Sequence, residues 1–384
     1  MDAKIWIWGM GDAGKLVLNY LKYKGLGVRG LIDNGEKIAH TSYAGYEVCC
    51  FDEARYIIGE EELVVCCCSL ASYEVFKESL LRIGHNRYKH FYDLDLSDYI
   101  FRIVDEGHEN RFISKLCTEN DFMDRDFQKI HAELIGGEGI RTLHRKHWEW
   151  IYIVQVLQYY DLLEEGKSGI GFAVGKEPLP SYFAKKHIDV LASDLTIEDK
   201  DAKGWKDTNQ HASGNIKALW YKSICGEEIF DRYVRYRDID MNELPEDEHD
   251  YDFCWSSCAI EHLGNLEKSK RFLKNMLKVL KSGGVGVHTT EFNLSSDDKT
   301  MEHGDSVIFR KKDIEEMKEW FRIRGHYMEA SYKRARTEGN AYIDISPYRS
   351  EYRPYHLSLA ANGYVETSFA FVIVKDGLKR CDKK

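Results

Sequence analysis

The sequence has few prolines, no long apolar run and no excess of positive charge. Its five prolines and 30 glycines among 384 residues leave little room for a low-complexity linker. A net charge of −10 and a pI of about 5.9 argue against non-specific nucleic-acid binding, which needs a basic face. The most apolar stretch, 63–71, has the length of a strand, whereas a membrane span needs about 20 apolar residues. These absences predict a protein with no membrane span and no nucleic-acid partner.

The N-terminus lacks the basic region, apolar core and cleavage site of a signal peptide, so we expect none. The ten cysteines contain no C-x-x-C pair, which argues against a structural zinc site of the usual spacing. Three of them, Cys66, Cys67 and Cys68, continue an apolar run, where cysteine behaves as a small hydrophobic residue. Free thiols fit a reducing compartment, so we predict a cytoplasmic protein and leave a homo-oligomer open.

A chain of this length predicts two or three domains, and its patterning divides it into three parts. Residues 1–100 alternate short apolar strands with helices, and the same alternation returns in 166–384. Residues 101–165 have helical spacing and many charges, and they end in a long aromatic amphipathic helix. Alternation with a glycine turn after the first strand indicates a parallel sheet. We therefore predict an α/β fold with two Rossmann-like doubly wound sheets joined by a helical connector.

The first glycine turn follows the strand at 4–8 and opens a helix. It has the spacing Gly9-x-Gly11-x-x-Gly14, and Asp33 ends the second strand. Such glycines let the backbone approach a phosphate, the helix N-terminus attracts it, and the carboxylate takes ribose hydroxyls. The pattern predicts a nucleotide site. The alternative is a Rossmann-like domain that binds no redox cofactor.

This first block resembles the nucleotide-sugar-binding N-terminal domain of bacterial sugar acyltransferases. The resemblance covers most of residues 1–100 and rests on IWIWGMGDAGK, GLIDN and YAGYEV. It implies a nucleotide or sugar-nucleotide ligand and does not imply hydride chemistry.

A second glycine turn, GIGFAVGKEPLP at 169–180, also follows a strand. Together with RKHWEW, GWKDTNQHA, WSSCAIEHLG, VHTTEFNLSSDD and YVETSFAFVIVK, it makes residues 140–378 similar to class I S-adenosylmethionine-dependent methyltransferases of glycan and natural-product clusters. Two departures from that family's pattern matter. Gly171 replaces the usual acidic residue, and Ala173 replaces the middle glycine, where alanine fits the turn only with a negative φ.

The resemblance implies S-adenosylmethionine as cofactor and a set of residues that bind it. Gly175 would bring backbone near the methionine part, and Asp194 would hold the ribose diol. Asp240 would accept from the adenine amino group while Met241 packs on the ring. Two serines follow the fourth strand at the carboxyl edge, where open sheets bind ligands. The predicted set is Gly171, Ala173, Gly175, Glu177, Asp194, Leu195, Asp240, Met241, Ser256 and Ser257.

Methyl transfer is an in-line displacement at a sulfonium carbon, so the enzyme positions the nucleophile and helps remove a hydroxyl proton. Candidate bases are Glu261 and His262 in SSCAIEHLG, and His288 and Glu291 in VHTTEFN. Each histidine has the alternative of a structural, hydrogen-bonded residue. The four residues are also an alternative metal site, but we predict no metal.

Two further features have structural interpretations. Cys254, Cys258 and His262 are spaced by four, but Cys254 lies in an expected strand, so we interpret the triplet as core packing. Trp148 and Glu149 on the connector helix are candidates to reach the same cleft, with helix packing as the alternative.

Substrate contacts are predicted at Trp205, Gln210 and His211 in GWKDTNQHA and at Asn293. Amides and an aromatic face suit a sugar, whereas the alternative is a cap over the cofactor. We predict an O-methyltransferase acting on a sugar or another hydroxylated small molecule in surface-glycan or secondary-metabolite biosynthesis. Residues 1–100 would hold a nucleotide-linked part of that substrate. The alternatives are an NAD(P)-dependent sugar-nucleotide oxidoreductase or epimerase, and a non-catalytic binding protein with a degenerate methyltransferase domain.

Overall fold

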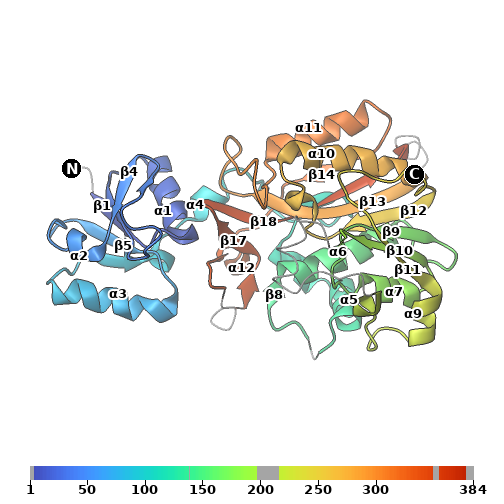
Figure 1. Cartoon of the computed structure of the whole chain (residues 1–384), viewed down its shortest axis with the longest axis horizontal. Helices are drawn as coiled ribbons and strands as arrows, with labels where there is room; N and C mark the ends of the chain where they lie inside the picture. The colour runs from blue at the N-terminus through green and yellow to red at the C-terminus, as the bar shows by residue number, and fades with distance from the viewer. Residues whose placement is uncertain (1–3, 138, 197–215, 349–353, 378–384) are drawn as a thin grey trace. The chain divides into compact units, whose positions relative to one another are not determined.

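A computed structural model describes residues 4–137, 139–196, 216–348 and 354–377 (Figure 1). The chain forms two compact units. Unit 1 comprises Met1–Ile103, Leu294–Ser296 and Glu338–Glu366. Unit 2 comprises Val104–Asn293, Asp297–Thr337 and Thr367–Lys384.

Unit 1 contains a six-stranded sheet with the order β3-β4-β2-β1-β5-β6. Strands β2, β1, β5 and β6 are parallel. Strand β2 lies on one side of β1, and β5 lies on the other. The elements are β1 (Ile5–Trp8), α1 (Asp12–Tyr23), β2 (Val28–Ile32), β3 (Ser42–Tyr43), β4 (Tyr46–Cys49), α2 (Phe51–Ala54), β5 (Leu63–Cys66), α3 (Leu70–Arg82), β6 (Tyr88–His90), η1 (Phe91–Asp93) and α4 (Ser97–Ile100).

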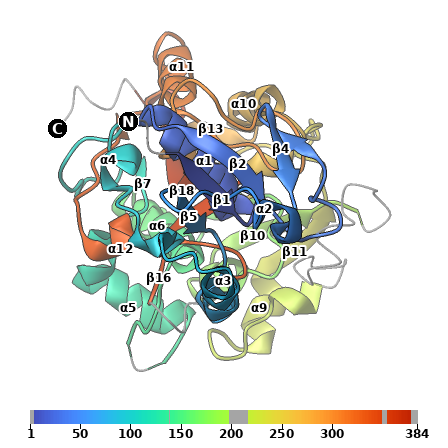
Figure 2. The ribbon, with the colours of Figure 1, turned by 90° about the vertical axis from the view of Figure 1, so that its left-hand side faces the viewer.

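Helices cover both faces of this sheet, which explains why β1 is apolar throughout. Successive side chains of a strand point to opposite faces, and Trp6 and Trp8 pack with Ala54 of α2 and Leu80 of α3. The intervening isoleucines of β1 are also buried. Figure 2 shows α1 and α3 on opposite sides of the strands.

The segment 338–366 belongs to unit 1, although the sequence analysis placed it in the 166–384 domain. The backbone N–H of Asn362 donates to Asp12 Oδ1 (2.9 Å), and Asn19 Nδ2 donates to the carbonyl of Gly363 (2.9 Å). These contacts join residues more than 340 positions apart, so no local pattern reveals them. The segment contains α12 (Glu338–Ala341), β15 (Ile343–Asp344), β16 (Tyr355–His356), β17 (Ser358–Ala361) and the start of β18 (Tyr364–Val374).

The sheet of unit 2 has the order β11-β10-β9-β12-β13-β18, and β7 pairs with β18 and β14. The five strands from β11 to β13 are parallel to one another. Its strands are β7 (Ser114–Leu116), β8 (Leu143–His144), β9 (Ser168–Gly171), β10 (Asp189–Asp194), β11 (Val234–Asp238), β12 (Tyr251–Ser256), β13 (Leu280–Asn293), β14 (Ala330–Ser331) and β18. Parallel strands in both units confirm the predicted α/β class.

Helices lie on both sides of the unit 2 sheet. Figure 1 shows α10 and α11 on one side and α6 and α7 on the other. The helices are η2 (Glu119–Met123), α5 (Arg125–Leu134), α6 (Arg145–Tyr159), α7 (Leu179–Lys185), η3 (Ile216–Leu219), α9 (Glu227–Tyr233), η4 (Ile260–His262), α10 (Leu266–Asn275), η5 (Met276–Lys278) and α11 (Lys311–Arg322).

Most of the expected helical connector at 101–165 belongs to unit 2, and besides its helices it contains a strand that was not expected, β7. Strand β7 pairs antiparallel with β18, and α6 packs against β13. The sequence SKL of β7 is too short to show alternation, and Lys115 within it is buried in an ion pair with Asp121 (2.7 Å). Only long-range pairing therefore identifies this strand.

Two sequence predictions, on membrane spans and on cysteines, concern features that the structure describes. Among the described residues, every helix is too short or too polar to span a bilayer. The nine cysteines in the described ranges are all free thiols.

Candidate active site

The centre of the unit 2 sheet has a topological switch between β9 and β12. The chain continues from β9 to β10 on one side, and β12 lies on the other. In open α/β sheets, ligands bind outside the carboxyl ends of the strands at such a point. The loop after β9 is tied to both neighbours, because the Phe172 N–H donates to Trp255 O (2.9 Å) and the Val174 N–H donates to Ser193 O (3.0 Å).

The backbone of this loop is left-handed at Ala173 (φ +48°) and Gly175 (φ +52°). The expectation of a negative φ at Ala173 is therefore wrong. A left-handed alanine costs about 1–2 kcal/mol, and residues held in such conformations cluster at ligand sites. The loop keeps the turn of a glycine-rich motif even though one glycine has become alanine.

The missing acidic side chain at Gly171 has a steric explanation. A Cβ atom at Gly171 would lie 2.3 Å from the Trp255 ring, which fills the space above this glycine. Trp255 Nε1 donates to Glu177 Oε1 (2.5 Å), so the same indole holds a carboxyl group in the loop. Burial raises the pKa of Glu177 to about 8. Gly171 thus leaves room for the Trp255 ring, and the carboxyl group of Glu177 lies six residues later in the chain.

Replacing Gly171 by alanine is expected to destabilise unit 2 by about 1–3 kcal/mol, because the new methyl group overpacks a rigid aromatic contact. Gly226→Ala is the control, because a Cβ there meets nothing within 4 Å, and it should cost about 0.5 kcal/mol. Urea unfolding followed by tryptophan fluorescence measures both. Equal losses in the two variants would contradict the packing role of Gly171.

Predicted cofactor residues follow the neighbouring strands. Asp194 is the buried last residue of β10, and its Oδ1 accepts from the Leu195 N–H (2.9 Å). Asp240 lies just after β11, where its Oδ1 accepts from the Asn242 N–H (2.7 Å), and Met241 is buried beside it. The structure therefore brings these residues to the carboxyl edge on the β10 side of the switch.

A buried polar network lies on the β12 side, and it centres on Glu149 of α6. Glu149 Oε1 accepts from Ser368 Oγ (2.6 Å) and Cys258 Sγ (3.0 Å), and its Oε2 accepts from Ser257 Oγ (2.9 Å). Burial opposes the charge, but the Lys146 and Arg145 cations lower the pKa of Glu149 to about 2. Ser257 therefore binds Glu149 in this structure.

Sequence analysis missed the part that Arg145 plays in this network. Its Nη1 donates to Glu291 Oε1 (2.5 Å) and lies 3.5 Å from Glu149 Oε1. Arg145 and Glu149 are one helical turn apart in α6. The detectable signal was this i, i+4 charged pair on a helix whose other residues are largely apolar.

Three of the four predicted catalytic residues come together beside this network. Glu261 and Glu291 are buried, and their carboxylates lie close to the Cys258 thiol. His262 Nδ1 lies 2.5 Å from the carbonyl oxygen of Asp305, and its Nε2 lies 3.8 Å from Glu261 Oε1. A carbonyl only accepts, so Nδ1 carries a proton, and in the neutral ring Nε2 is the acceptor nitrogen. The His262 side chain remains 31% exposed, so solvent reaches it.

His288 has a different environment from His262. It is fully buried in β13, where Nδ1 hydrogen-bonds Ser256 Oγ (2.8 Å) and the ring packs edge-on against Phe272. Burial lowers the pKa of His288 to about 3. This environment matches the structural alternative for His288, and it also turns Ser256 toward the protein interior.

The buried His288 is expected to make unit 2 acid-sensitive. Its folded pKa lies below the unfolded value of about 6.5, so the unfolded state binds more protons between pH 6.5 and about 3. Stability is therefore lost as the pH falls through this window, by up to about 1.4 kcal/mol per pH unit. His288→Asn should flatten the pH dependence of the free energy of unfolding, whereas the exposed His249→Asn should not. If the free energy of unfolding depended on pH in the same way in His288→Asn and wild type, the assignment of the acid sensitivity to His288 would be refuted.

The predicted substrate residues are only partly described. Trp205, Gln210 and His211 lie outside the described residues. Asn293 is buried, and its Nδ2 donates to Lys299 O and Thr300 Oγ1, both at 3.2 Å. In this structure Asn293 holds a loop of unit 2.

The first glycine turn, in unit 1, is explained in part by packing. Gly9 has φ +99°, and a Cβ at Gly14 would lie 1.9 Å from the Gly9 carbonyl oxygen. A Cβ at Gly11 would meet nothing within 4 Å. Both carboxylate oxygens of Asp33 accept from backbone N–H groups, those of Met10 (2.6 Å) and Gly35 (2.7 Å). Gly9, Gly14 and Asp33 therefore shape the turn, and Gly11 leaves its outer surface open.

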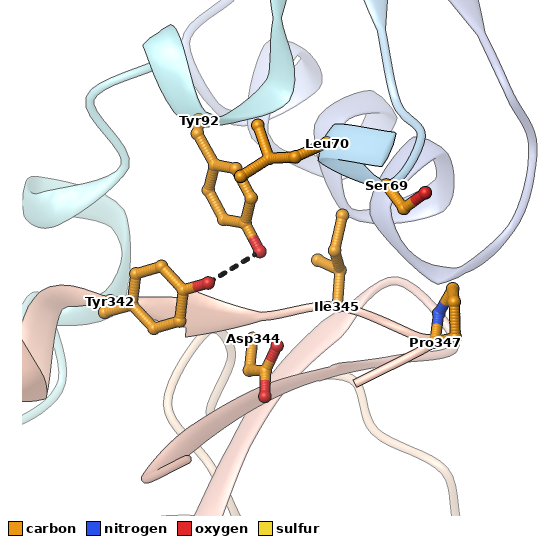
Figure 3. A pocket seen from close by; sticks show the side chains of 7 residues that line it. All are labelled: Ser69, Leu70, Tyr92, Tyr342, Asp344, Ile345 and Pro347. Atoms are coloured by element: carbon orange, nitrogen blue, oxygen red, sulfur yellow. Dashed lines mark hydrogen bonds between the residues drawn. The ribbon is translucent and has the colours of Figure 1, made fainter. Parts of the chain in front are cut away.

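A small pocket also lies within unit 1 (Figure 3). The Tyr92 and Tyr342 hydroxyls meet across it at 3.0 Å. The buried Asp344 on its lower side pairs with His356 Nδ1 (2.8 Å). None of the predicted nucleotide residues lines it; the lining residues are Ser69, Leu70, Tyr92, Tyr342, Asp344, Ile345 and Pro347.

Comparison with known proteins identifies the class of unit 2. Residues 177–287 match the family described as a methyltransferase domain. This stretch begins at Glu177 and ends in β13, so it includes Asp194, Asp240 and His262 but not β9, its glycine turn or Glu149. Residues 177–287 thus form a methyltransferase domain, and S-adenosylmethionine is the cofactor that this domain implies, as predicted. None of the curated proteins matches the chain.

Solved methyltransferase structures show a distant likeness. A TehB-like enzyme from Corynebacterium glutamicum is 13% identical, with 55% of this chain and 80% of that chain covered and a TM-score of 0.30. An enzyme from Clostridium acetobutylicum is 12% identical, with 65% and 98% covered and a TM-score of 0.34. The chain spans between 52% and 60% of the length of three further structures. Likeness at this level does not specify a substrate.

Proposed function

We propose that unit 2 transfers a methyl group to a hydroxyl oxygen of a sugar or another hydroxylated small molecule. The observation that carries this proposal is the orientation of His262, whose Nδ1 is bound to the Asp305 carbonyl. A histidine whose ring is oriented by a fixed partner at one nitrogen is an arrangement that activates a hydroxyl. Hydroxyl acceptors need such a base because an un-ionised hydroxyl is a weak nucleophile.

The residues at the carboxyl edge fit the cofactor in kind. The Asp194 carboxylate at the end of β10 matches a ribose diol, and Asp240 with Met241 matches an adenine ring. The positive φ at Gly175 brings backbone to the edge of the switch without a side chain. When bound, S-adenosylmethionine supplies an electrophilic methyl group.

His262 would remove the acceptor proton. Its Nε2 would take up the hydroxyl proton, while S-adenosylmethionine would supply the methyl group to the oxygen. Glu261 Oε1, at 3.8 Å from Nε2, stabilises the positive charge that the ring acquires. Hydrogen bonding of Nδ1 to the Asp305 carbonyl keeps the ring in this orientation during the transfer.

The full chain with methyl-labelled S-adenosylmethionine tests the proposal. The acceptors are a panel of sugars, nucleotide sugars and polyols, with amines and thiols of similar size as the matched set. We expect a methyl ether on at least one hydroxylated compound, identified by mass spectrometry. Methylation confined to amines or thiols would contradict the proposed acceptor.

For unit 1 we propose that the glycine turn holds a nucleotide-linked part of the substrate in a glycan or secondary-metabolite pathway. The open surface over Gly11 at the start of α1 supports this, because a helix N-terminus attracts phosphate. Gly11→Ala would place a methyl group on this surface, where it meets no protein atom within 4 Å, and φ at this position is −68°. Calorimetry of the full chain should show nucleotide-sugar binding that this variant loses. Equal binding by the variant would contradict the proposed location.

A further inference from the structure

We propose that Cys258, Glu261 and Glu291 form a divalent-cation site in unit 2, and that zinc matches their donor atoms best. Cys258 follows β12, Glu261 lies in η4 and Glu291 lies near the end of β13. One ligand atom from each, a thiol sulfur and two carboxylate oxygens, lies within 4.8 Å of the others. All three residues are buried, so the group is not a chance gathering of surface charges.

Two oxygen atoms of these carboxylates lack a hydrogen-bond partner within the described ranges. Glu261 Oε1 and Glu291 Oε2 are buried and have no hydrogen-bond partner among the residues that the structure describes. The two side chains are only 1% and 4% exposed. Burying a charged oxygen without a partner costs several kcal/mol. A bound cation would remove this cost at both atoms.

The second oxygen of each carboxylate is held in place. Arg145 Nη1 donates to Glu291 Oε1 (2.5 Å), and Thr290 Oγ1 donates to Glu261 Oε2 (3.2 Å). Metal-binding carboxylates are commonly oriented by such outer hydrogen bonds. Each carboxylate thus has one oxygen fixed by the protein and one left for the cation.

The charges of the cluster also favour a divalent ion. Among the described residues, the carboxylates of Glu149, Glu261 and Glu291 face the two side-chain cations Arg145 and Lys146, besides the His262 ring. One negative charge is therefore uncompensated when the carboxylates are ionised and His262 is neutral. A divalent cation that displaces the Cys258 proton adds a single net positive charge and balances the cluster.

The donor set distinguishes among cations. A thiolate is a soft ligand that favours zinc over magnesium or calcium, and zinc also accepts carboxylate oxygens. Three protein ligands leave a fourth tetrahedral position, as in catalytic zinc sites. If the proposed function holds, this position would receive the acceptor oxygen, whose proton goes to His262.

Metal analysis of the full chain tests the site. Wild-type protein, purified without chelators and dialysed, should contain a stoichiometric amount of zinc by mass spectrometry. Cys258→Ser and Glu291→Gln should each lose most of it. The exposed group His40, Cys50 and Glu53 is the other candidate among the described residues, so His40→Ala is the matched control and should retain the zinc.

Cobalt substitution supplies a second readout. Cobalt bound to a thiolate gives a charge-transfer absorption, which we expect in wild type and Glu291→Gln at saturating cobalt, and not in Cys258→Ser. Calorimetry with S-adenosylhomocysteine checks that each variant still folds and tests the methyltransferase assignment separately. Wild type that binds the cofactor but takes up neither zinc nor cobalt would overturn the metal site alone. Loss of zinc in His40→Ala, with zinc retained in Cys258→Ser and Glu291→Gln, would also overturn the proposed site.

Discussion

Replacing Asp194 by alanine is expected to weaken the binding of S-adenosylmethionine about 100-fold. Asp194 ends β10 beside the switch and is buried, so its carboxylate is already oriented when a ribose diol arrives. A hydrogen bond to a charged group contributes about 1.5–3 kcal/mol, and about 2.7 kcal/mol corresponds to this change in Kd. Isothermal calorimetry with S-adenosylmethionine or S-adenosylhomocysteine measures the effect directly.

Asp189 supplies the control for that experiment. It is the exposed first residue of β10, at the opposite end of the strand, and Asp189→Ala should leave Kd within about twofold. Asp194→Asn keeps the shape of the side chain and should fall between wild type and Asp194→Ala. Unchanged affinity in Asp194→Ala, with a folded protein, would show that the ribose binds elsewhere.

Replacing His262 by glutamine should lower the rate of methyl transfer about 10²–10⁴-fold, the usual contribution of a general base. Affinity for S-adenosylmethionine should stay unchanged, because His262 lies on the β12 side of the switch and Asp194 lies on the β10 side. The measurement is the single-turnover rate at saturating cofactor, with the hydroxylated acceptor found in the panel.

His249→Gln is the matched control for the rate measurement. This histidine is exposed and paired with Asp250, and it precedes β12, whereas Ser257 and Cys258 of the network around Glu149 follow that strand. It should transfer methyl groups at the wild-type rate. A His262→Gln rate within a few-fold of wild type would remove His262 as the base and favour Glu261 or Glu291.

Local sequence patterns predict the sheets of both units well. The apolar strand IWIW, the glycine turn after it and the carboxylate at the end of β10 each arise from residues close in sequence. Turn geometry and strand burial act over a few residues, so such features are readable from local order. The carboxyl-edge positions of Asp194 and Asp240 follow from them.

The parts that sequence could not predict depend on long-range contacts. Arg145 in α6 reaches Glu291 in β13, and Asp12 reaches Asn362, because of how distant segments pack. Trp255 over Gly171 is another case, since a glycine gives no hint of the ring that covers it. Nothing in the local pattern encodes these partners.

The candidate metal site shows the same limit for function. The absence of a C-x-x-C pair argues against a structural zinc site of the usual spacing, and the position of Cys254 in a strand favours core packing for Cys258. Its proposed partners Glu261 and Glu291 lie on η4 and β13, with spacings that match no common zinc motif. In the part of the chain that the structure describes, two buried carboxylate oxygens without a hydrogen-bond partner point to a cation.

The most direct test of the account is a crystal structure of the full chain with S-adenosylhomocysteine. We predict the nucleoside at the carboxyl ends of β9, β10 and β11, with its ribose on Asp194 and its amino-acid end near Gly175 and Glu177. A ligand bound only at the glycine turn of unit 1, or a switch filled by the protein's own side chains, would contradict it.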